Sequence, residues 1–72
     1  MIEIQAEMDA TVWQMLVVTG QSVAVDDEVI ILESMKMEIP VIATSNGTIA
    51  SIQVSEGDAV KRGQTLITLE SD

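Results

Sequence analysis

The feature that most limits how this chain can fold is an internal repeat. When the sequence is shifted against itself by 37 positions, its two halves align without a gap. Identical residues then coincide at Ile2 and Ile39, Ala6 and Ala43, Thr11 and Thr48, Val17 and Val54, Gly20 and Gly57, Val23 and Val60, and Ile30 and Ile67. Residues 1–35 match residues 38–72, and only Lys36 and Met37 lie between the copies. Such self-similarity indicates two equivalent units, and we expect a pseudo-twofold axis to relate them within one domain, residues 1–72.

Each copy has the residue pattern of short β-strands. Apolar residues alternate with polar ones at Ile2, Ile4, Ala6 and Met8, and again at Met37, Ile39, Val41 and Ala43, which is the period of a half-buried strand. Further apolar segments follow in each copy at residues 12–18 and 49–54, 23–25 and 59–60, and 29–32 and 66–69. About four strands per copy predict a sandwich or flattened barrel. No window has the 3.6-residue apolar period of a helix, so we expect little or no helix.

Two local signals refine this prediction. Asn46-Gly47 is a turn signal. Pro40 has no backbone N–H to donate, so we expect it at a sheet edge or at the start of a strand.

Composition excludes several classes of function. Twelve acidic residues against three basic ones give a net charge of −9, which repels nucleic acids and anionic membranes and favours a monomer. The chain has no Cys and no His, and the acidic run Asp26-Asp27-Glu28 lacks the spacing of a calcium loop, so we expect no metal site. No apolar run reaches the ~20 residues that span a bilayer, and no signal-peptide pattern opens the chain. We therefore expect a cytoplasmic protein.

The junction between the copies is predicted to be a β-hairpin with Met35 and Lys36 at its tip. A two-residue primed turn favours Gly, Asn or Asp, because its φ angles are positive, and neither tip residue meets that preference. A local rule broken at one position often marks a functional constraint. The alternative for a lone tip lysine is a solvated charge that prevents edge aggregation. Against it stand the methionines on both sides, Met35 and Met37, because exposed apolar groups need a reason.

The segment Glu33-Ser34-Met35-Lys36-Met37 resembles the Glu-Ala-Met-Lys-Met or Glu-Ser-Met-Lys-Met attachment motif of the biotinyl/lipoyl attachment family, as in biotin carboxyl carrier proteins and stand-alone biotin/lipoyl attachment proteins. The resemblance extends along the chain, with similar residues at Thr11-Val12-Trp13, Gly20, Val23, Gly47-Thr48, Glu56-Gly57-Asp58 and Gly63-Gln64. It implies an all-β flattened barrel of two four-stranded antiparallel sheets, with Lys36 on a hairpin tip as the attachment residue. Met8-Asp9-Ala10 departs from the family, which often has Pro-Gly there.

The resemblance also implies a function as a biotin carboxyl carrier. A biotin protein ligase would form an amide between biotin and Lys36, and the arm would move a carboxyl group between biotin carboxylase and carboxyltransferase components. The carrier itself would have no catalytic residues, because the cofactor does the chemistry and the protein positions it. The residues expected to be recognised by the ligase or another partner are Glu33, Ser34, Met35, Met37 and Glu38.

Alternatives to this function stay open at this point. Lipoyl domains typically have Asp-Lys-Ala at the tip, so the flanking methionines favour biotin, although short proteins that resemble this one can carry lipoate. A catalytic lysine needs an apolar pocket or a neighbouring cation, whereas Glu33 and Glu38 favour the protonated amine of Lys36, so we expect no enzyme. An unmodified structural or interaction domain is the third alternative. Trp13 coincides with Ala50 in the repeat, and we expect it to cover part of one sheet and to mark a partner surface.

Overall fold

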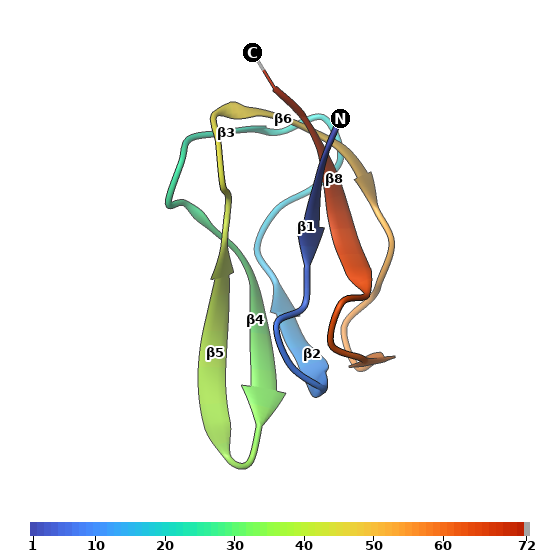
Figure 1. Cartoon of the computed structure of the whole chain (residues 1–72). Helices are drawn as coiled ribbons and strands as arrows, with labels where there is room; N and C mark the ends of the chain where they lie inside the picture. The colour runs from blue at the N-terminus through green and yellow to red at the C-terminus, as the bar shows by residue number, and fades with distance from the viewer. Residues whose placement is uncertain (72) are drawn as a thin grey trace.

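The computed structural model describes residues 1–71, which form eight β-strands (Figure 1). The strands are β1 (Ile2–Gln5), β2 (Ala10–Met15), β3 (Ser22–Val23), β4 (Glu28–Ser34), β5 (Met37–Ile42), β6 (Gly47–Ile52), β7 (Ala59–Val60) and β8 (Thr65–Ser71). They form two four-stranded sheets, and all neighbouring strands run antiparallel. The predicted all-β fold of two four-stranded antiparallel sheets is confirmed.

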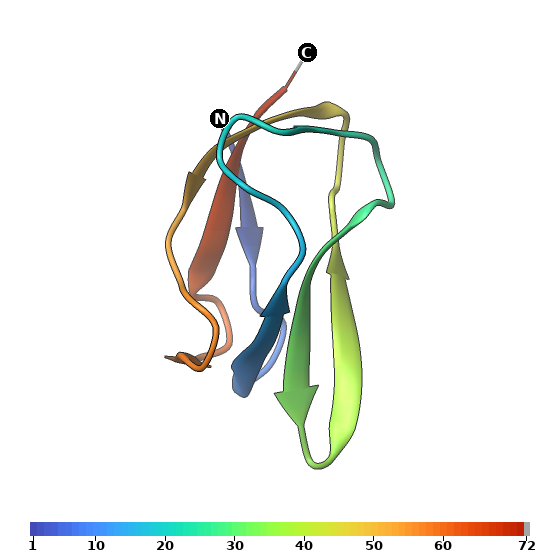
Figure 2. The ribbon, with the colours of Figure 1, turned by 180° about the vertical axis from the view of Figure 1, so that it is seen from behind.

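Each sheet combines strands from both halves of the chain. One sheet has the order β1-β8-β6-β3 and the other the order β5-β4-β2-β7. Replacing each strand by its equivalent in the other half converts the first order into the second, as a pseudo-twofold axis requires. The molecule is elongated, with extents of 35 × 17 × 17 Å. The β4–β5 hairpin occupies one end of it, and Met1 lies at the opposite end (Figure 1 and Figure 2).

The hydrogen bonds of the connecting loops are duplicated in the same way. The N–H of Gly20 donates to the carbonyl of Ile49 at 2.8 Å, and the equivalent N–H of Gly57 donates to the carbonyl of Val12 at 2.8 Å. Loop side chains follow the same rule: Val25 N–H donates to Asn46 Oδ1, and its equivalent Arg62 N–H donates to Asp9 Oδ1, both at 2.8 Å. The two halves therefore have matching local geometry, although their side chains differ at many positions.

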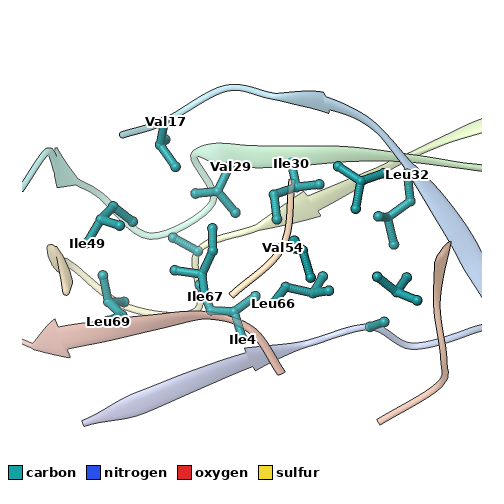
Figure 3. Close-up of a cluster of buried hydrophobic side chains, with 14 of the residues drawn as sticks. Ile4, Val17, Val29, Ile30, Leu32, Ile49, Val54, Leu66, Ile67 and Leu69 are labelled. Carbon is teal, nitrogen blue, oxygen red and sulfur yellow. The ribbon is translucent and has the colours of Figure 1, made fainter. Parts of the chain in front are cut away.

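The core lies between the two sheets and consists of aliphatic side chains (Figure 3). The largest fully buried side chains are Ile30, Leu32, Ile49, Leu66, Ile67, Leu69, Val12 and Val29. Burial of one such side chain contributes about 1.5–3 kcal/mol relative to leaving it exposed. Within residues 1–71, no polar or charged residue is buried. A chain without Cys or His thus obtains its stability from apolar packing, which strand alternation directs to one face of each sheet.

Some strand boundaries differ from the sequence prediction. The apolar run at 12–18 continues beyond the end of β2 at Met15, where Val17 is buried in the core but Val18 is 67% exposed. Pro40 lies in β5, an edge strand, as predicted. In the part of the chain that the structure describes, no helix has the length and apolarity needed to cross a membrane.

Asn46-Gly47 does not form a hairpin turn. Asn46 instead accepts a hydrogen bond from the Val25 N–H, and Gly47 is the first residue of β6. A Cβ at Gly47 would lie 2.3 Å from the carbonyl oxygen of Glu70. Gly47 therefore allows β6 and β8 to approach closely. Close approach of another backbone is one of the reasons for a glycine within a strand.

Candidate functional site

The β4–β5 hairpin ends in a two-residue turn formed by Met35 and Lys36. Ser34 and Met37 are directly paired across the two strands, so only these two residues connect them. The φ angles are +53° at Met35 and +64° at Lys36. Positive φ at both central residues is the signature of a type I′ turn, whose twist matches that of the flanking strands.

This turn places two side-chain-bearing residues in the left-handed region. For an L-residue with a Cβ, that region costs roughly 1–2 kcal/mol per residue. Asp26, with φ of +74°, is the other non-glycine residue of this kind within residues 1–71, and its equivalent in the second half is Gly63. Met35 and Lys36 thus form the position at which two successive side chains are held against their backbone preference. Such strain is concentrated at functional sites, where the surrounding structure maintains it.

The turn extends beyond the rest of its sheet. The pairing of β2 with β4 begins at Thr11 and Glu33, so no third strand supports the Ser34–Met37 pair. Lys36 is exposed, and the side chain of Met35 is 89% exposed. The amine of Lys36 is consequently accessible to another protein. The β4–β5 hairpin that carries Lys36 extends beyond the other strands (Figure 1).

The residues predicted to be recognised by partners lie together in successive rows of the hairpin. Ser34 is half-buried and pairs with Met37, which is 59% exposed. Glu33 and Glu38 are exposed and directly opposite one another in the next row. Like charges directly opposite destabilise a sheet, so this pair is suited to a cationic group supplied by a partner.

The other lysine of the chain has a different setting. Lys61 follows β7 in a loop, where its backbone N–H donates to Gln64 Oε1 at 3.0 Å. Its equivalent in the first half is Ala24, whose N–H makes the same kind of bond to Asp27 Oδ2 at 2.9 Å. The backbone around Lys61 is therefore part of a duplicated loop, whereas Lys36 lies in the turn that joins the two halves.

Among residues 1–71, no group of three or more His, Cys, Asp or Glu side chains is arranged to hold an ion. The exposed amine of Lys36 on a two-residue turn leaves room for a covalently attached group, because no neighbouring strand covers the tip.

Known proteins are similar to this chain in both sequence and fold. The family model described as biotin-requiring enzyme, the biotin/lipoyl attachment domain, matches residues 2–69. The biotin/lipoyl attachment protein of Bacillus subtilis is 37% identical over 68 residues, which cover 94% of this chain and 93% of that protein. The biotin carboxyl carrier protein of Streptococcus mutans is 41% identical over 64 residues, which cover 89% of this chain and 49% of the relative.

A solved structure extends the comparison to the backbone. The urea carboxylase of Kluyveromyces lactis matches with a TM-score of 0.90 and 30% sequence identity, over 96% of this chain and 6% of that much longer one. The chain belongs to the biotin/lipoyl attachment domain family, whose members are non-catalytic carriers of biotin or lipoate bound covalently to a lysine.

Proposed function

We propose that Lys36 is the attachment residue and that the chain is a biotin carboxyl carrier. The observation that carries the proposal is the position of Lys36 in a strained two-residue turn, exposed at the end of the hairpin with a methionine on each side. A solvated surface lysine does not require φ of +64°, since a Gly or Asn would occupy the same turn at lower cost.

Attachment requires a free amine and an activated acid. A biotin protein ligase supplies biotin as its adenylate, and the Nζ of Lys36 attacks the acyl carbon. A carbon–nitrogen bond forms, AMP leaves, and the amine releases its proton to solvent. The hairpin contributes accessibility, because no third strand covers the Ser34–Met37 pair on which the turn rests.

Once attached, biotin supplies the capacity to carry a carboxyl group. The chain's own part is to tether the cofactor on a long side chain at the far end of an elongated body, which keeps the local concentration of the arm high at both partner sites. We propose a biotin carboxylase and a carboxyltransferase component as those partners, in keeping with the carrier described for Streptococcus mutans. Glu33, Ser34, Met35, Met37 and Glu38 are the proposed recognition residues.

Lipoate on Lys36 is the second candidate. The Bacillus subtilis relative is described as a biotin/lipoyl attachment protein, and the turn that exposes Lys36 suits either acid. The methionine pair around Lys36 is the feature that favours biotin.

Mass measurement of the protein purified from its native cells tests both candidates. The biotin and lipoate adducts have different masses, and fragmentation locates the modified lysine. We expect a biotin adduct on Lys36. A lipoate adduct would replace biotin with the second candidate, and unmodified Lys36 in that sample would refute the carrier proposal.

Labelling in vitro adds a matched pair of variants. With a biotin ligase, ATP and biotin, Lys36→Arg should abolish labelling, whereas Lys61→Arg should leave it unchanged. Arg keeps the charge in each case, so the pair separates chemistry at one amine from a general effect of charge. If Lys36→Arg is still labelled, Lys36 is not the attachment residue and the assignment is wrong.

A further inference from the structure

The two sheets have equivalent backbones but different outer faces. On the sheet that contains the hairpin, the outward positions of the three neighbouring strands β2, β4 and β5 include four apolar residues, Trp13, Ile31, Pro40 and Ile42, beside the polar Thr11, Gln14, Glu33 and Glu38. The positions equivalent to the four apolar residues hold Ala50, Thr68, Glu3 and Gln5 in the other sheet. We refer to Trp13, Ile31, Pro40 and Ile42 as the Trp13 face. Since the same backbone tolerates small or polar residues at these positions, the fold does not require the Trp13 face to be apolar.

Strand alternation shows that the Trp13 face points away from the core. Along β5, Ile39 and Val41 pack against the core, whereas Pro40 and Ile42 between and beyond them are exposed. Ile31 does not belong to the core cluster, although it is only 9% exposed. It is paired with Pro40 on one side and with Gln14 of β2 on the other.

Trp13 directly precedes Gln14 in β2, next to the row of Pro40, Ile31 and Gln14. It lies where the pairing of β2 with β4 shifts register between Val12 and Gln14, and its side chain is 44% exposed. A bulge of this kind redirects a side chain. The equivalent bulge of β6 carries Ala50, so the tryptophan is a difference between the halves and not a requirement of the bulge.

The equivalent face of the other sheet is satisfied by hydrogen bonds. Thr68 is hydrogen-bonded to Ser51, and the Nε2 of Gln53 donates to the Ser51 hydroxyl at 2.8 Å. The Thr65 hydroxyl donates to the carboxylate of Glu3 at 2.6 Å. That face is polar and suited to contact with solvent, whereas the Trp13 face exposes the indole ring and aliphatic carbon atoms.

The Trp13 face is continuous with the Lys36 turn. Pro40 and Ile31 form one row of the hairpin, and Glu33 and Glu38 form a row between them and the tip. With a rise of about 3.3 Å per residue, Pro40 lies roughly 13 Å along the strand from Lys36. Trp13 lies two strands from β5, which is roughly 10 Å to the side. One protein of ordinary interface size, about 800 Å² per partner, covers both.

We propose that the Trp13 face is the docking surface for the ligase that modifies Lys36, which makes this inference dependent on the proposed function. An enzyme that acts directly on the Lys36 amine must contact the turn. The side chains of the two turn residues, Met35 and Lys36, provide little surface area for binding. The adjacent Trp13 face supplies the missing apolar area, with Trp13 as the kind of anchor that dominates interfaces. The row of Glu33 and Glu38 requires Lys or Arg on the ligase beside its apolar surface.

The repeat supplies the test variants, because each replaces a residue with the one that the other half carries at the same backbone position. Trp13→Ala and Ile42→Gln follow Ala50 and Gln5. The assay measures biotin transfer to the full chain by a biotin ligase with ATP, over a range of carrier concentrations. We expect kcat/KM to fall by about tenfold or more for Trp13→Ala, which is within the range of an interface anchor, and by a smaller factor for Ile42→Gln. The change should appear in KM, with kcat preserved.

Gln53→Ala is the control. Gln53 is exposed on the hydrogen-bonded face of the other sheet and does not line the cavity that Pro40 and Ile42 share with β1, so its substitution should leave kcat/KM unchanged. Thermal unfolding of every variant separates docking from stability. Since Ile42 lies on an exposed edge, Ile42→Gln remains informative if Trp13→Ala fails to fold.

The outcomes distinguish this inference from the proposed function. If wild-type chain is labelled on Lys36 and the Trp13-face variants are labelled with the same kcat/KM, the docking surface is refuted and the carrier function stands. If Gln53→Ala loses as much as Ile42→Gln, the effect is not specific to the Trp13 face and the inference fails. If wild-type Lys36 is never labelled, both fail.

Discussion

Replacement of Met35 by Asn should stabilise the protein. Met35 holds a φ of +53°, a conformation that Asn adopts more readily than other residues with a Cβ, because its short polar side chain bonds locally. The side chain of Met35 is 89% exposed, so its removal takes away little packing. The substitution therefore changes the backbone preference of one turn residue and almost nothing else.

The magnitude follows from the left-handed penalty. An ordinary L-residue loses roughly 1–2 kcal/mol there, and Asn recovers part of that amount. We expect a gain of about 1 kcal/mol in the free energy of unfolding, which for a domain of this size is a rise of about 4–8 °C in Tm. Thermal and urea unfolding followed by circular dichroism measure both quantities.

Met37→Asn is the matched control, with the same chemical change two residues away. Met37 is also an exposed methionine, but it lies in β5, where Asn is disfavoured. We expect no gain or a loss of up to about 1 kcal/mol. Equal changes in the two variants, or a lower Tm for Met35→Asn, would refute the assignment of turn strain to Met35.

Two further predictions concern the packing of the sheets. Gly47→Ala should destabilise the protein by about 1–3 kcal/mol or more, because the new Cβ would lie 2.3 Å from the carbonyl oxygen of Glu70. Ala10→Gly at the equivalent position of β2 should lose no more than about 1 kcal/mol, and equal losses in urea unfolding would contradict the role given to Gly47. Leu66→Ala should lose about 2–5 kcal/mol, since Leu66 is fully buried, whereas Leu16→Ala at a 41% exposed position should change stability little. Similar Tm values for the two leucine variants would show that Leu66 does not support the core.

The strand pattern was predictable because the repeat doubled each local signal. A two-residue strand such as β3 (Ser22–Val23) is too short for periodicity to detect, but its equivalent β7 occupies the matching position in the second half. The end of β2 was harder to predict. Val17 is buried and continues the apolar run, although it belongs to the loop after Met15.

Asn46-Gly47 illustrates what sequence alone does not reveal. The residue pair itself is a turn signal, because a glycine that follows an asparagine usually supplies a positive φ angle in a turn. Here Gly47 provides a close approach to the Glu70 carbonyl, a contact between residues far apart in the chain. Such a requirement depends on which strands become neighbours, and no local pattern contains that information.

The candidate site was predictable in position and less so in its surroundings. The turn at Met35 and Lys36 follows from the repeat junction, and the missing Gly or Asn already indicated strain. The Trp13 face required the register, because only pairing shows that Ile31 and Pro40 are neighbours. The sequence contained one indication of this face: the repeat aligns Trp13 with Ala50, so a large apolar residue occupies a position where the other half has a small one.

The arrangement of the strands also determines how the chain must fold. Each sheet takes its two inner strands from one half and its two outer strands from the other. A half alone would retain only the β2–β4 or the β6–β8 ribbon, and an isolated two-stranded ribbon is marginal in water. Pairing of β1 with β8 joins the two extremes of the chain, so contacts of high sequence separation dominate and folding is expected in milliseconds to seconds. The native state is therefore cooperative across the repeat, and cleavage between Met35 and Lys36 would yield two fragments that are ordered only when they associate.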